Sequence, residues 1–179
     1  MPLAPRPRHV NVPPPMHAKP SAPLAFVAKA IATAGGAGYV PVAPGTAGTA
    51  VAVPLAWLMA DFGLPLYLAV TVGVTLLGIA AAHVADAAWE THDSQRIVID
   101  EVAGYLVTMA FVSRHSWIAL LAGFVVFRVL DVVKPPPARW VDQKMPGGPG
   151  VVLDDVVAGI YGALLMVLVF NVLIARQLP

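Results

Sequence analysis

Uncharged stretches separated by short polar segments dominate the chain after residue 48. Residues 62–85 contain no Asp, Glu, Lys or Arg and would span about 36 Å as a helix, enough to cross a bilayer. Residues 156–175 form a second long stretch. The stretches 49–60, 102–113 and 115–127 are shorter than the roughly 17 residues of a full crossing and need flanking residues or a thinned bilayer. The pattern predicts an all-α integral membrane bundle of about five apolar helices, some of them short.

The composition agrees with this pattern. Hydrophobic residues make up 58% of the 179 residues and charged residues only 12%, which is low for a domain that must keep its whole surface in water. The net charge of +1 gives no reason to expect a nucleic-acid partner. The absence of cysteine excludes disulfides and thiolate metal sites. The oligomeric state is not indicated by the sequence.

The first 23 residues differ from the rest of the chain. They are rich in proline and basic residues and lack the apolar core of a signal peptide, so they are interpreted as a disordered cytoplasmic tail. Residues 24–179 are predicted to form a single membrane-embedded domain. Within it, residues 24–34 are interpreted as an interfacial helix that precedes the first crossing.

The distribution of charge predicts an orientation. If all five apolar stretches cross a bilayer, the polar segments between them alternate between its two faces. Lys and Arg prefer cytoplasmic segments, and all of them except Arg114 and Arg176 fall on the side of the N-terminus. Of the acidic residues, only Asp61 falls on the other side. The sequence therefore predicts a polar site at the cytoplasmic face, assembled from helix ends that are distant in the chain.

A glycine-rich segment, GYVPVAPGTAGTA at residues 38–50, leads into the first apolar stretch. Its glycines would let backbone N–H groups approach an anion, and Thr46 or Thr49 is expected to cap the following helix. The segment lacks the lysine of a phosphate-binding P-loop, so an ordinary loop with a helix cap is the alternative. The candidate phosphate-binding residues here are Gly45, Thr46, Gly48 and Thr49.

Two pairs of acidic residues stand at the beginning of apolar stretches: Asp100 with Glu101, and Asp154 with Asp155. One acid at a helix N-terminus is explained by capping or by the helix dipole. A second carboxylate beside the hydrocarbon region is costly and is not needed for capping. The two pairs are therefore interpreted as parts of a cation site.

FRVLDVVKPPP, residues 127–137, ends an apolar stretch with three charged residues spaced three apart. Arg128, Asp131 and Lys134 would lie on nearly one face of a helix, which the prolines then terminate. A basic helix end with an internal salt bridge is one interpretation. The other assigns Arg128 and Lys134 to phosphate oxygens and Asp131 to a metal ion.

Hard oxygen ligands without clustered histidine or cysteine favour Mg²⁺ over zinc. The candidate catalytic residues, of which a subset would hold the metal, are Asp100, Glu101, Asp131, Asp154 and Asp155. His83, Asp86 and Glu90 share a helical face but are interpreted as a solvated continuation of the long helix. His92 and Asp93 are candidates for a proton donor or for an indirect metal contact.

Four segments, in order, resemble the phosphatidylglycerophosphatase A family: GYVPVAPGTAGT, HDSQRIVIDEVAG, FRVLDVVKPPPARWVD and GGPGVVLDDVVAG. The resemblance implies Mg²⁺-dependent removal of the terminal phosphate of phosphatidylglycerophosphate, at the cytoplasmic face of a bacterial inner membrane. It points to the same five acids and to Arg128 and Lys134 as site residues. Pro136 departs from the family pattern, which often has an aromatic residue there.

An ion-coupled transporter or channel is the alternative from a different class, because carboxylates within a membrane can carry cations. Such carboxylates are expected near the middle of a helix, whereas these stand at the ends of apolar stretches. A catalytically inactive scaffold is a third reading. The pattern favours chemistry on a lipid headgroup.

Overall fold

The computed structural model describes residues 19–91 and 93–175. Within these ranges the chain forms seven α-helices and one 3-10 helix, with no strand, which confirms the all-α prediction. The predicted tail falls mostly on residues 1–18, which lie outside the described ranges. Helix α1, Ala22–Ala32, begins two residues earlier than the interfacial helix predicted from the sequence.

Two helices, α3 (Leu64–Trp89) and α7 (Gly148–Ala175), are long and apolar enough to cross a membrane. They pack closely near the start of α7, where a Cβ atom on Gly148 would collide with the backbone of Ile79. The other helices that match predicted apolar stretches are shorter, with 10 to 17 residues in α2 (Pro44–Leu58), α4 (Ile99–Thr108) and α5 (Trp117–Val133). Five crossings therefore stay a prediction.

Helix α4 lies at the centre of the fold and contacts α2, α3, α5 and α7. Glycines allow α4 and α7 to approach each other, because a Cβ atom on Gly104 would meet the Asp155 carbonyl at 2.6 Å. Two buried tyrosines fix the surrounding helices. The Tyr67 hydroxyl donates to the Leu106 carbonyl at 2.7 Å, and the Tyr105 hydroxyl donates to the Leu120 carbonyl at 2.9 Å. The short central helix is thus held by its neighbours on several sides.

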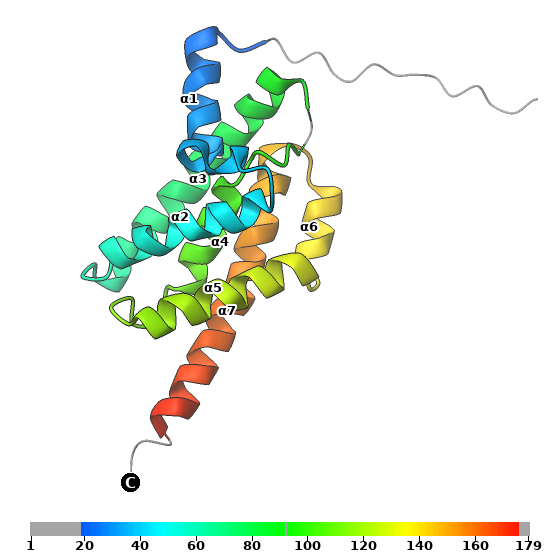
Figure 1. Ribbon diagram of the computed structural model, residues 1–179. Coiled ribbons are helices and arrows are strands. Elements are labelled where there is room, and N and C mark those ends of the chain that lie inside the picture. The colour runs from blue at the N-terminus through cyan, green and yellow to red at the C-terminus, as the bar shows by residue number, and fades with distance from the viewer. Residues whose placement is uncertain (1–18, 92, 176–179) are drawn as a thin grey trace, which may run out of the picture.

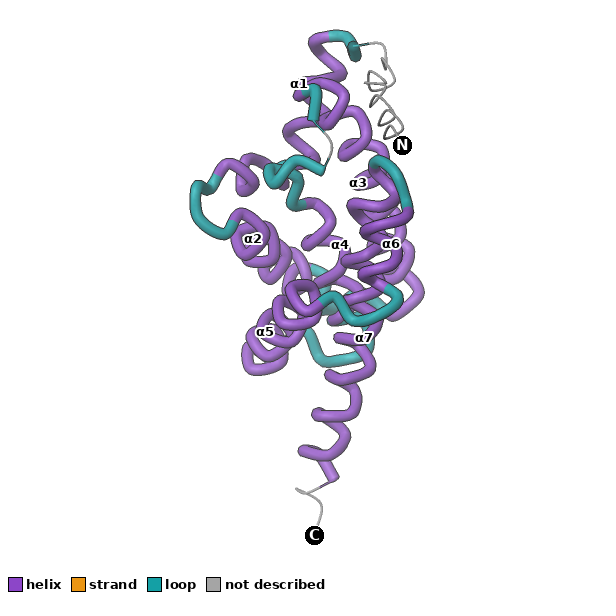
Figure 2. The backbone as a smooth tube through the Cα atoms, turned by 90° about the vertical axis from the view of Figure 1, so that its right-hand side faces the viewer, coloured by secondary structure: helices purple, strands orange, loops and turns teal. Residues whose placement is uncertain are grey.

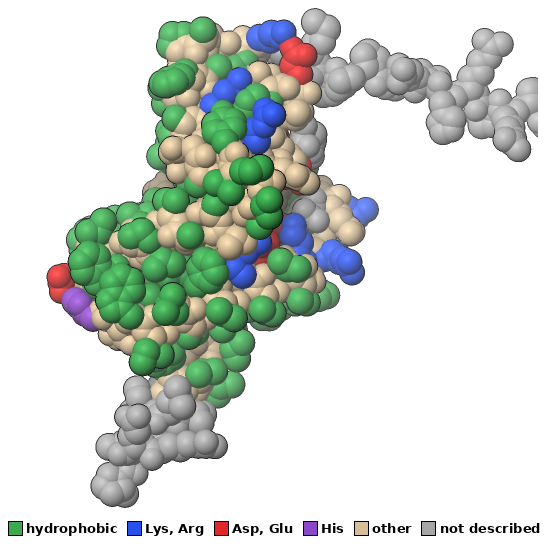
Figure 3. All heavy atoms as spheres, viewed as in Figure 1, with side chains coloured by type: hydrophobic (Ala, Val, Ile, Leu, Met, Phe, Trp, Pro, Cys, Tyr) green, Lys and Arg blue, Asp and Glu red, His purple; other side chains and the backbone are tan. Residues whose placement is uncertain are grey.

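Helices α2 and α5 lie side by side across one face of α4 and α7 (Figure 1), and the view turned by 90° places both on the same side of the molecule (Figure 2). Apolar side chains cover this face (Figure 3). Exposed examples are Val51, Leu58, Ile118 and Leu121, and Trp57 stacks on Trp117 with ring centroids 5.9 Å apart. An apolar outer surface of this kind is expected where lipid replaces water.

Several helix ends differ from the sequence prediction. Helix α2 begins at Pro44, with Ala43 in the left-handed region (φ 52°) as its N-cap, so the prediction that Thr46 or Thr49 caps this helix is wrong. Proline suits this first position because it has no N–H to satisfy. Helix α7 begins at Gly148, which places Asp154 and Asp155 well beyond its first turn. Neither of these two acids therefore caps the helix.

Short helices complete the fold. Helix α1 packs against α3, and the 3-10 helix η1 (Ala34–Tyr39) connects α1 to the segment before α2. Helix α6 (Ala138–Lys144) follows the three prolines and packs against α7. The sequence does not predict α6, because seven residues with mixed polarity give too little periodicity.

Arg114 connects the C-terminal end of α2 to the C-terminal end of α4. Arg114 is only 8% exposed, and its guanidinium lies over the Tyr67 ring, 3.9 Å from the ring centroid. It donates to four backbone carbonyls near the C-terminal ends of the two helices: Met59, Phe62, Met109 and Ala110. Carbonyls at helix ends have no partner within the helix, and one guanidinium satisfies several of them here.

Candidate active site

The N-terminal ends of α2, α4 and α7 meet the C-terminal end of α5 around a cavity of about 330 Å³. Its wall contains every charged residue that the sequence assigned to the site. These residues are Asp100, Glu101, Arg128, Asp131, Lys134, Asp154 and Asp155. Of the predicted glycine-rich residues, the described wall includes Gly45 but not Thr46, Gly48 or Thr49.

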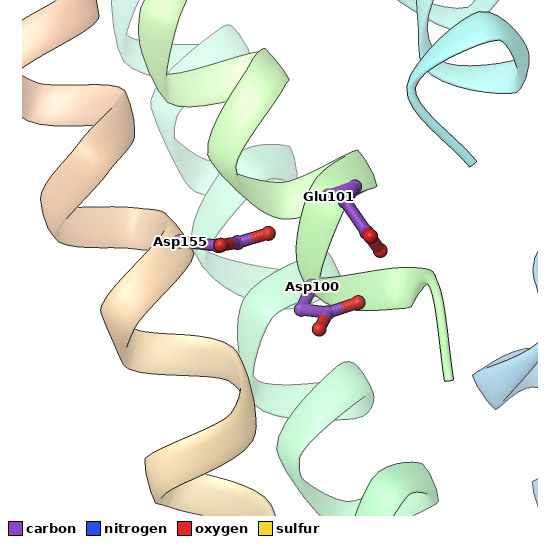
Figure 4. Close-up of side chains that lie close together, drawn as sticks. All are labelled: Asp100, Glu101 and Asp155. Carbon is purple, nitrogen blue, oxygen red and sulfur yellow. The ribbon is translucent and has the colours of Figure 1, made fainter. Parts of the chain in front are cut away.

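Three of the acids form a compact cluster. Asp100 and Glu101 stand in the first turn of α4, and Asp155 points toward them from α7 (Figure 4). One carboxylate oxygen from each of the three lies within 4.8 Å of the others. Asp155 is 3% exposed, and the Glu101 side chain is 13% exposed. The cluster joins residues that are more than 50 positions apart in the chain.

The other two acids are paired with the two cations of the cavity. Arg128 Nη1 lies 2.6 Å from Asp131 Oδ2 and 3.7 Å from Glu101 Oε1, so it connects α5 to α4. Lys134 Nζ lies 2.6 Å from Asp154 Oδ2 on α7. The internal salt bridge of α5 therefore exists, as one of the two sequence interpretations predicted. It lies in the wall of the cavity, with both side chains largely shielded.

Burial strongly affects the acids at the start of α4. It raises the pKa of Asp100 well above its usual range, and the negative charge of Glu101 raises it further. Burial also raises the pKa of Glu101. Both residues precede the apolar stretch that begins at Val102. Their carboxylates are therefore unfavourable in the ionised state unless additional positive charge is close to them.

The chemistry of the cluster fits a metal ion. Among the described residues, Asp100 Oδ1 and Glu101 Oε2 are buried and have no hydrogen-bond partner. Buried carboxylate oxygens normally have partners, and three converging carboxylates provide the hard ligands that divalent cations prefer. Among the described residues of the cavity wall, six carboxylates, including that of Asp93, stand against the two cations Arg128 and Lys134, which leaves an excess of negative charge. A cation bound by Asp100, Glu101 and Asp155 would offset this excess.

Gly45 allows the first turn of α2 to lie directly on the site. A Cβ atom there would collide with the Glu101 carboxylate and come within 3.0 Å of Arg128 Nη1. Gly48 packs instead against Val98, and the buried Thr49 hydroxyl donates to the Gly45 carbonyl at 3.0 Å. Thr46 is exposed. The assignment of Thr46, Gly48 and Thr49 to phosphate binding stays a prediction, and Gly48 and Thr49 have evident packing roles.

Sequence reasoning missed part of the cavity wall. Asp93, Ser94 and Gln95, from the segment between α3 and α4, line the cavity. The sequence indicates Asp93 only as a partner of His92, and His92 lies outside the described residues. The interpretation of Asp86 as part of a solvated helix continuation is wrong, because this residue is 7% exposed and accepts hydrogen bonds from that segment. The sequence signal that could have indicated these three residues is their position shortly before Asp100.

Converging carboxylates beside an arginine and a lysine, in a cavity of an apolar helical protein, define a site of the kind that metal-dependent phosphoryl-transfer enzymes use. Residues 30–170 match the phosphatidylglycerophosphatase A family. The chain belongs to this family, and its relatives are phosphatases by name, which confirms the resemblance and the enzyme class predicted from the four motifs.

The individual relatives cover most of the chain. Phosphatidylglycerophosphatase A of Escherichia coli is 38% identical over 72% of this chain and 74% of its own length. Phosphatidylglycerophosphatase A of Haemophilus influenzae is 36% identical over 73% of this chain and 81% of its own. A Bacteroides thetaiotaomicron protein with the provisional name phosphatidylinositol-3-phosphatase is 36% identical over 79% of this chain and 92% of its own. No solved structure matches the chain.

Proposed function

We propose that the protein hydrolyses phosphatidylglycerophosphate to phosphatidylglycerol and inorganic phosphate, with Mg²⁺ held by the acidic cluster. The observation that carries this proposal is the convergence of Asp100, Glu101 and Asp155 beside Arg128 and Lys134 in one cavity. A phosphomonoester dianion needs positive charge on several of its oxygens, and the two basic side chains alone are outnumbered by carboxylates. Membership in the phosphatidylglycerophosphatase A family supports the choice of lipid substrate.

The residues have distinct roles in this proposal. Asp100, Glu101 and Asp155 would hold Mg²⁺, with Asp131 and Asp154 as further candidates. When bound there, Mg²⁺ supplies positive charge that withdraws electrons from the phosphate and stabilises the charge that develops on its oxygens. Arg128 and Lys134 bind the remaining phosphate oxygens, and Asp131 and Asp154 keep these two side chains in position through the pairs at 2.6 Å.

Water is the attacking group in the proposed reaction. Its oxygen forms a bond to phosphorus while the bond from phosphorus to the glycerol oxygen breaks, and the glycerol oxygen takes up a proton to become a hydroxyl. A carboxylate of the cluster accepts the proton of the water. Attack by an aspartate carboxylate, followed by hydrolysis of the phosphorylated aspartate, is the alternative that the sequence leaves open.

The proposed setting is the inner membrane of a bacterium, with several crossings and the cavity at the cytoplasmic face. The two long apolar helices support membrane insertion. The apolar outer surface of α2 and α5 supports the participation of shorter helices in the bilayer. The excess of Lys and Arg on the polar segments around the cavity supports the cytoplasmic orientation.

A liposome assay tests the proposal. Purified protein in vesicles that contain phosphatidylglycerophosphate is expected to release inorganic phosphate with Mg²⁺ present and to stop when EDTA is added. The matched variants are Asp100→Asn in the cluster and Asp61→Asn, whose side chain is 92% exposed. Loss of phosphate release in the first variant only is the expected result. Full release in EDTA, or normal turnover of Asp100→Asn, would contradict the proposed site.

The same vesicles address the transporter or channel alternative, which membership in a phosphatase family does not favour. A cation-sensitive dye inside the vesicles reports flux while phosphate release is recorded. The proposal predicts release without cation flux. Flux without release would support the alternative. Because one relative is named for a phosphoinositide, phosphatidylinositol 3-phosphate is a useful second substrate in this assay.

A further inference from the structure

A buried carboxylate outside the acidic cluster holds one wall of the cavity. Asp86 lies in the last turns of α3 and is 7% exposed. Its Oδ2 accepts a hydrogen bond from the Asp93 backbone N–H at 2.8 Å. Its Oδ1 accepts from the Ser94 backbone N–H and from the Thr91 hydroxyl, each at 3.1 Å. All three donors belong to the segment that connects α3 to α4.

The backbone of this segment has a conformation that needs such support. Glu90 and Asp93 both adopt the left-handed region, with φ values of 57° and 56°. Non-glycine residues adopt this region at an energetic cost, and surrounding contacts must hold them there. At the far end of the segment, the Val98 N–H donates to the Ala32 carbonyl of α1 at 2.8 Å. The segment is therefore fixed by Asp86 at its start and by α1 at its end.

The fixed segment reaches the cavity directly. Asp93, Ser94 and Gln95 line the cavity that contains the acidic cluster, and Asp100 follows a few residues later. The same three residues also line a neighbouring cavity of about 580 Å³. A displacement of this segment would change both the cavity wall and the approach of the chain to the first turn of α4.

We propose that Asp86 is a positioning residue for the phosphatase reaction. By accepting hydrogen bonds from the N–H groups of Asp93 and Ser94, it holds residues 93–95 against the cavity and keeps Asp100 close to Asp155. This inference rests on the proposed function of the cavity. Arg128 of α5 and Lys134 at its C-cap are held mainly by Asp131 and Asp154, so a loss of Asp86 affects turnover more than substrate binding.

The test compares Asp86→Asn with Asp61→Asn in detergent or vesicles that contain Mg²⁺. Asparagine keeps the size of the side chain but loses the charge and one acceptor oxygen. A displacement on the order of 1 Å at a reaction centre costs about a hundredfold in rate, so kcat of Asp86→Asn is expected to fall at least about tenfold. KM is expected to stay within about threefold of wild type, because the phosphate-binding cations are unchanged. Asp61→Asn is expected to retain both values.

Hydrogen exchange provides a readout that does not depend on activity. The amides of Asp93 and Ser94 are expected to exchange at least about tenfold faster in Asp86→Asn, while the amides of α4 and α7 stay protected. Wild-type kcat in Asp86→Asn would overturn the inference. A lower kcat without faster exchange in the segment would also overturn it.

A second variant keeps the inference testable if Asp86→Asn does not fold. Thr91→Val removes one of the three donors at an exposed position. It is expected to lower kcat about threefold with unchanged KM, and an unchanged kcat would count against the inference. If wild-type protein releases no phosphate from any lipid, the proposed function fails. The exchange data then decide alone whether Asp86 holds the segment.

Discussion

Lys134 Nζ lies 2.6 Å from Asp154 Oδ2, so an ion pair connects the C-terminal end of α5 to the second turn of α7. Asp154 is 4% exposed, and the Lys134 side chain is 30% exposed. Together with the contact of Arg128 to Asp131 and Glu101, this pair divides five acids of the cavity into two groups. Asp131 and Asp154 position cations, while Asp100, Glu101 and Asp155 converge on one another.

Removing the lysine is expected to affect both stability and catalysis. Lys134→Ala leaves a buried carboxylate without this partner and should lower the free energy of unfolding by about 2 kcal/mol. It also removes a cation from the phosphate site, so kcat/KM should fall about a hundredfold. Thermal unfolding in detergent and phosphate release measure the two effects. A double-mutant cycle with Asp154→Asn should give a coupling energy of at least about 1 kcal/mol, and additive effects would argue against the pair.

The acidic cluster predicts opposite effects on stability and activity. Asp155→Asn removes a buried negative charge that faces Asp100 and Glu101, so it should raise the melting temperature in EDTA. The same change should lower phosphate release with Mg²⁺ at least about a thousandfold, because a ligand of the proposed metal site is lost. A lower melting temperature in EDTA would show that the cluster is not under electrostatic repulsion.

The raised pKa values of Asp100 and Glu101 predict a pH dependence of stability in the absence of metal. A carboxyl group whose pKa is higher in the folded than in the unfolded state binds its proton more tightly when folded. Stability in EDTA should therefore increase as pH falls from neutral toward the unfolded-state pKa of about 4. Melting curves across this range provide the measurement. Asp100→Asn should show a weaker pH dependence, and saturating Mg²⁺ should also reduce it.

We expect activity to require glycine at position 45, because the site leaves no room for a side chain there. Gly45→Ala places a methyl group against the Glu101 carboxylate and Arg128, so it should lower kcat/KM at least about tenfold. The adjacent exposed variant Thr46→Ala is the control and should have a smaller effect. If Thr46→Ala costs as much as Gly45→Ala, the threonine hydroxyl takes part in phosphate binding as the sequence suggested.

Substitution of Arg114, at the end of α4 away from the cavity, is expected to affect stability and not catalysis. Arg114→Lys cannot reproduce a planar group that donates to four carbonyls and lies on the Tyr67 ring. It should lower the free energy of unfolding by about 2 kcal/mol. The kcat of the remaining folded protein should stay near wild type, because Asp100 is at the opposite end of the helix. A selective loss of kcat would indicate that the two ends are coupled.

The sequence predicted the site better than the boundaries of the elements that form it. Uncharged runs must be helical in a membrane, so their charged ends could be located from composition alone. This reasoning placed Asp100, Glu101, Arg128, Lys134 and Asp155 near one another. The contacts of Arg128 with Glu101 and of Lys134 with Asp154 join different helices, so they depend on how each helix is rotated about its axis. Uniformly apolar helices give little information on that rotation.

Two buried charged residues show what the sequence pattern does not reveal. The helical face that Asp86 shares with His83 and Glu90 predicts a solvated continuation of the long helix, but the buried Asp86 carboxylate accepts hydrogen bonds from backbone N–H groups of the next segment. Arg114 is similarly buried by binding carbonyls at helix ends. Apart from the Thr91 hydroxyl, the partners of both residues are backbone groups that any residue type provides. The sequence therefore contains no pattern that identifies them.

The most direct test of the proposed metal site is Mn²⁺ binding measured by electron paramagnetic resonance, with Mn²⁺ as a substitute for Mg²⁺. Wild-type protein and Asp61→Asn should both bind Mn²⁺ tightly, and Asp155→Asn should lose this binding while keeping its fold. Excess Mg²⁺ should displace the bound Mn²⁺ from wild type. Equal Mn²⁺ binding by wild type and Asp155→Asn, or the absence of binding to active wild-type protein, would contradict the account.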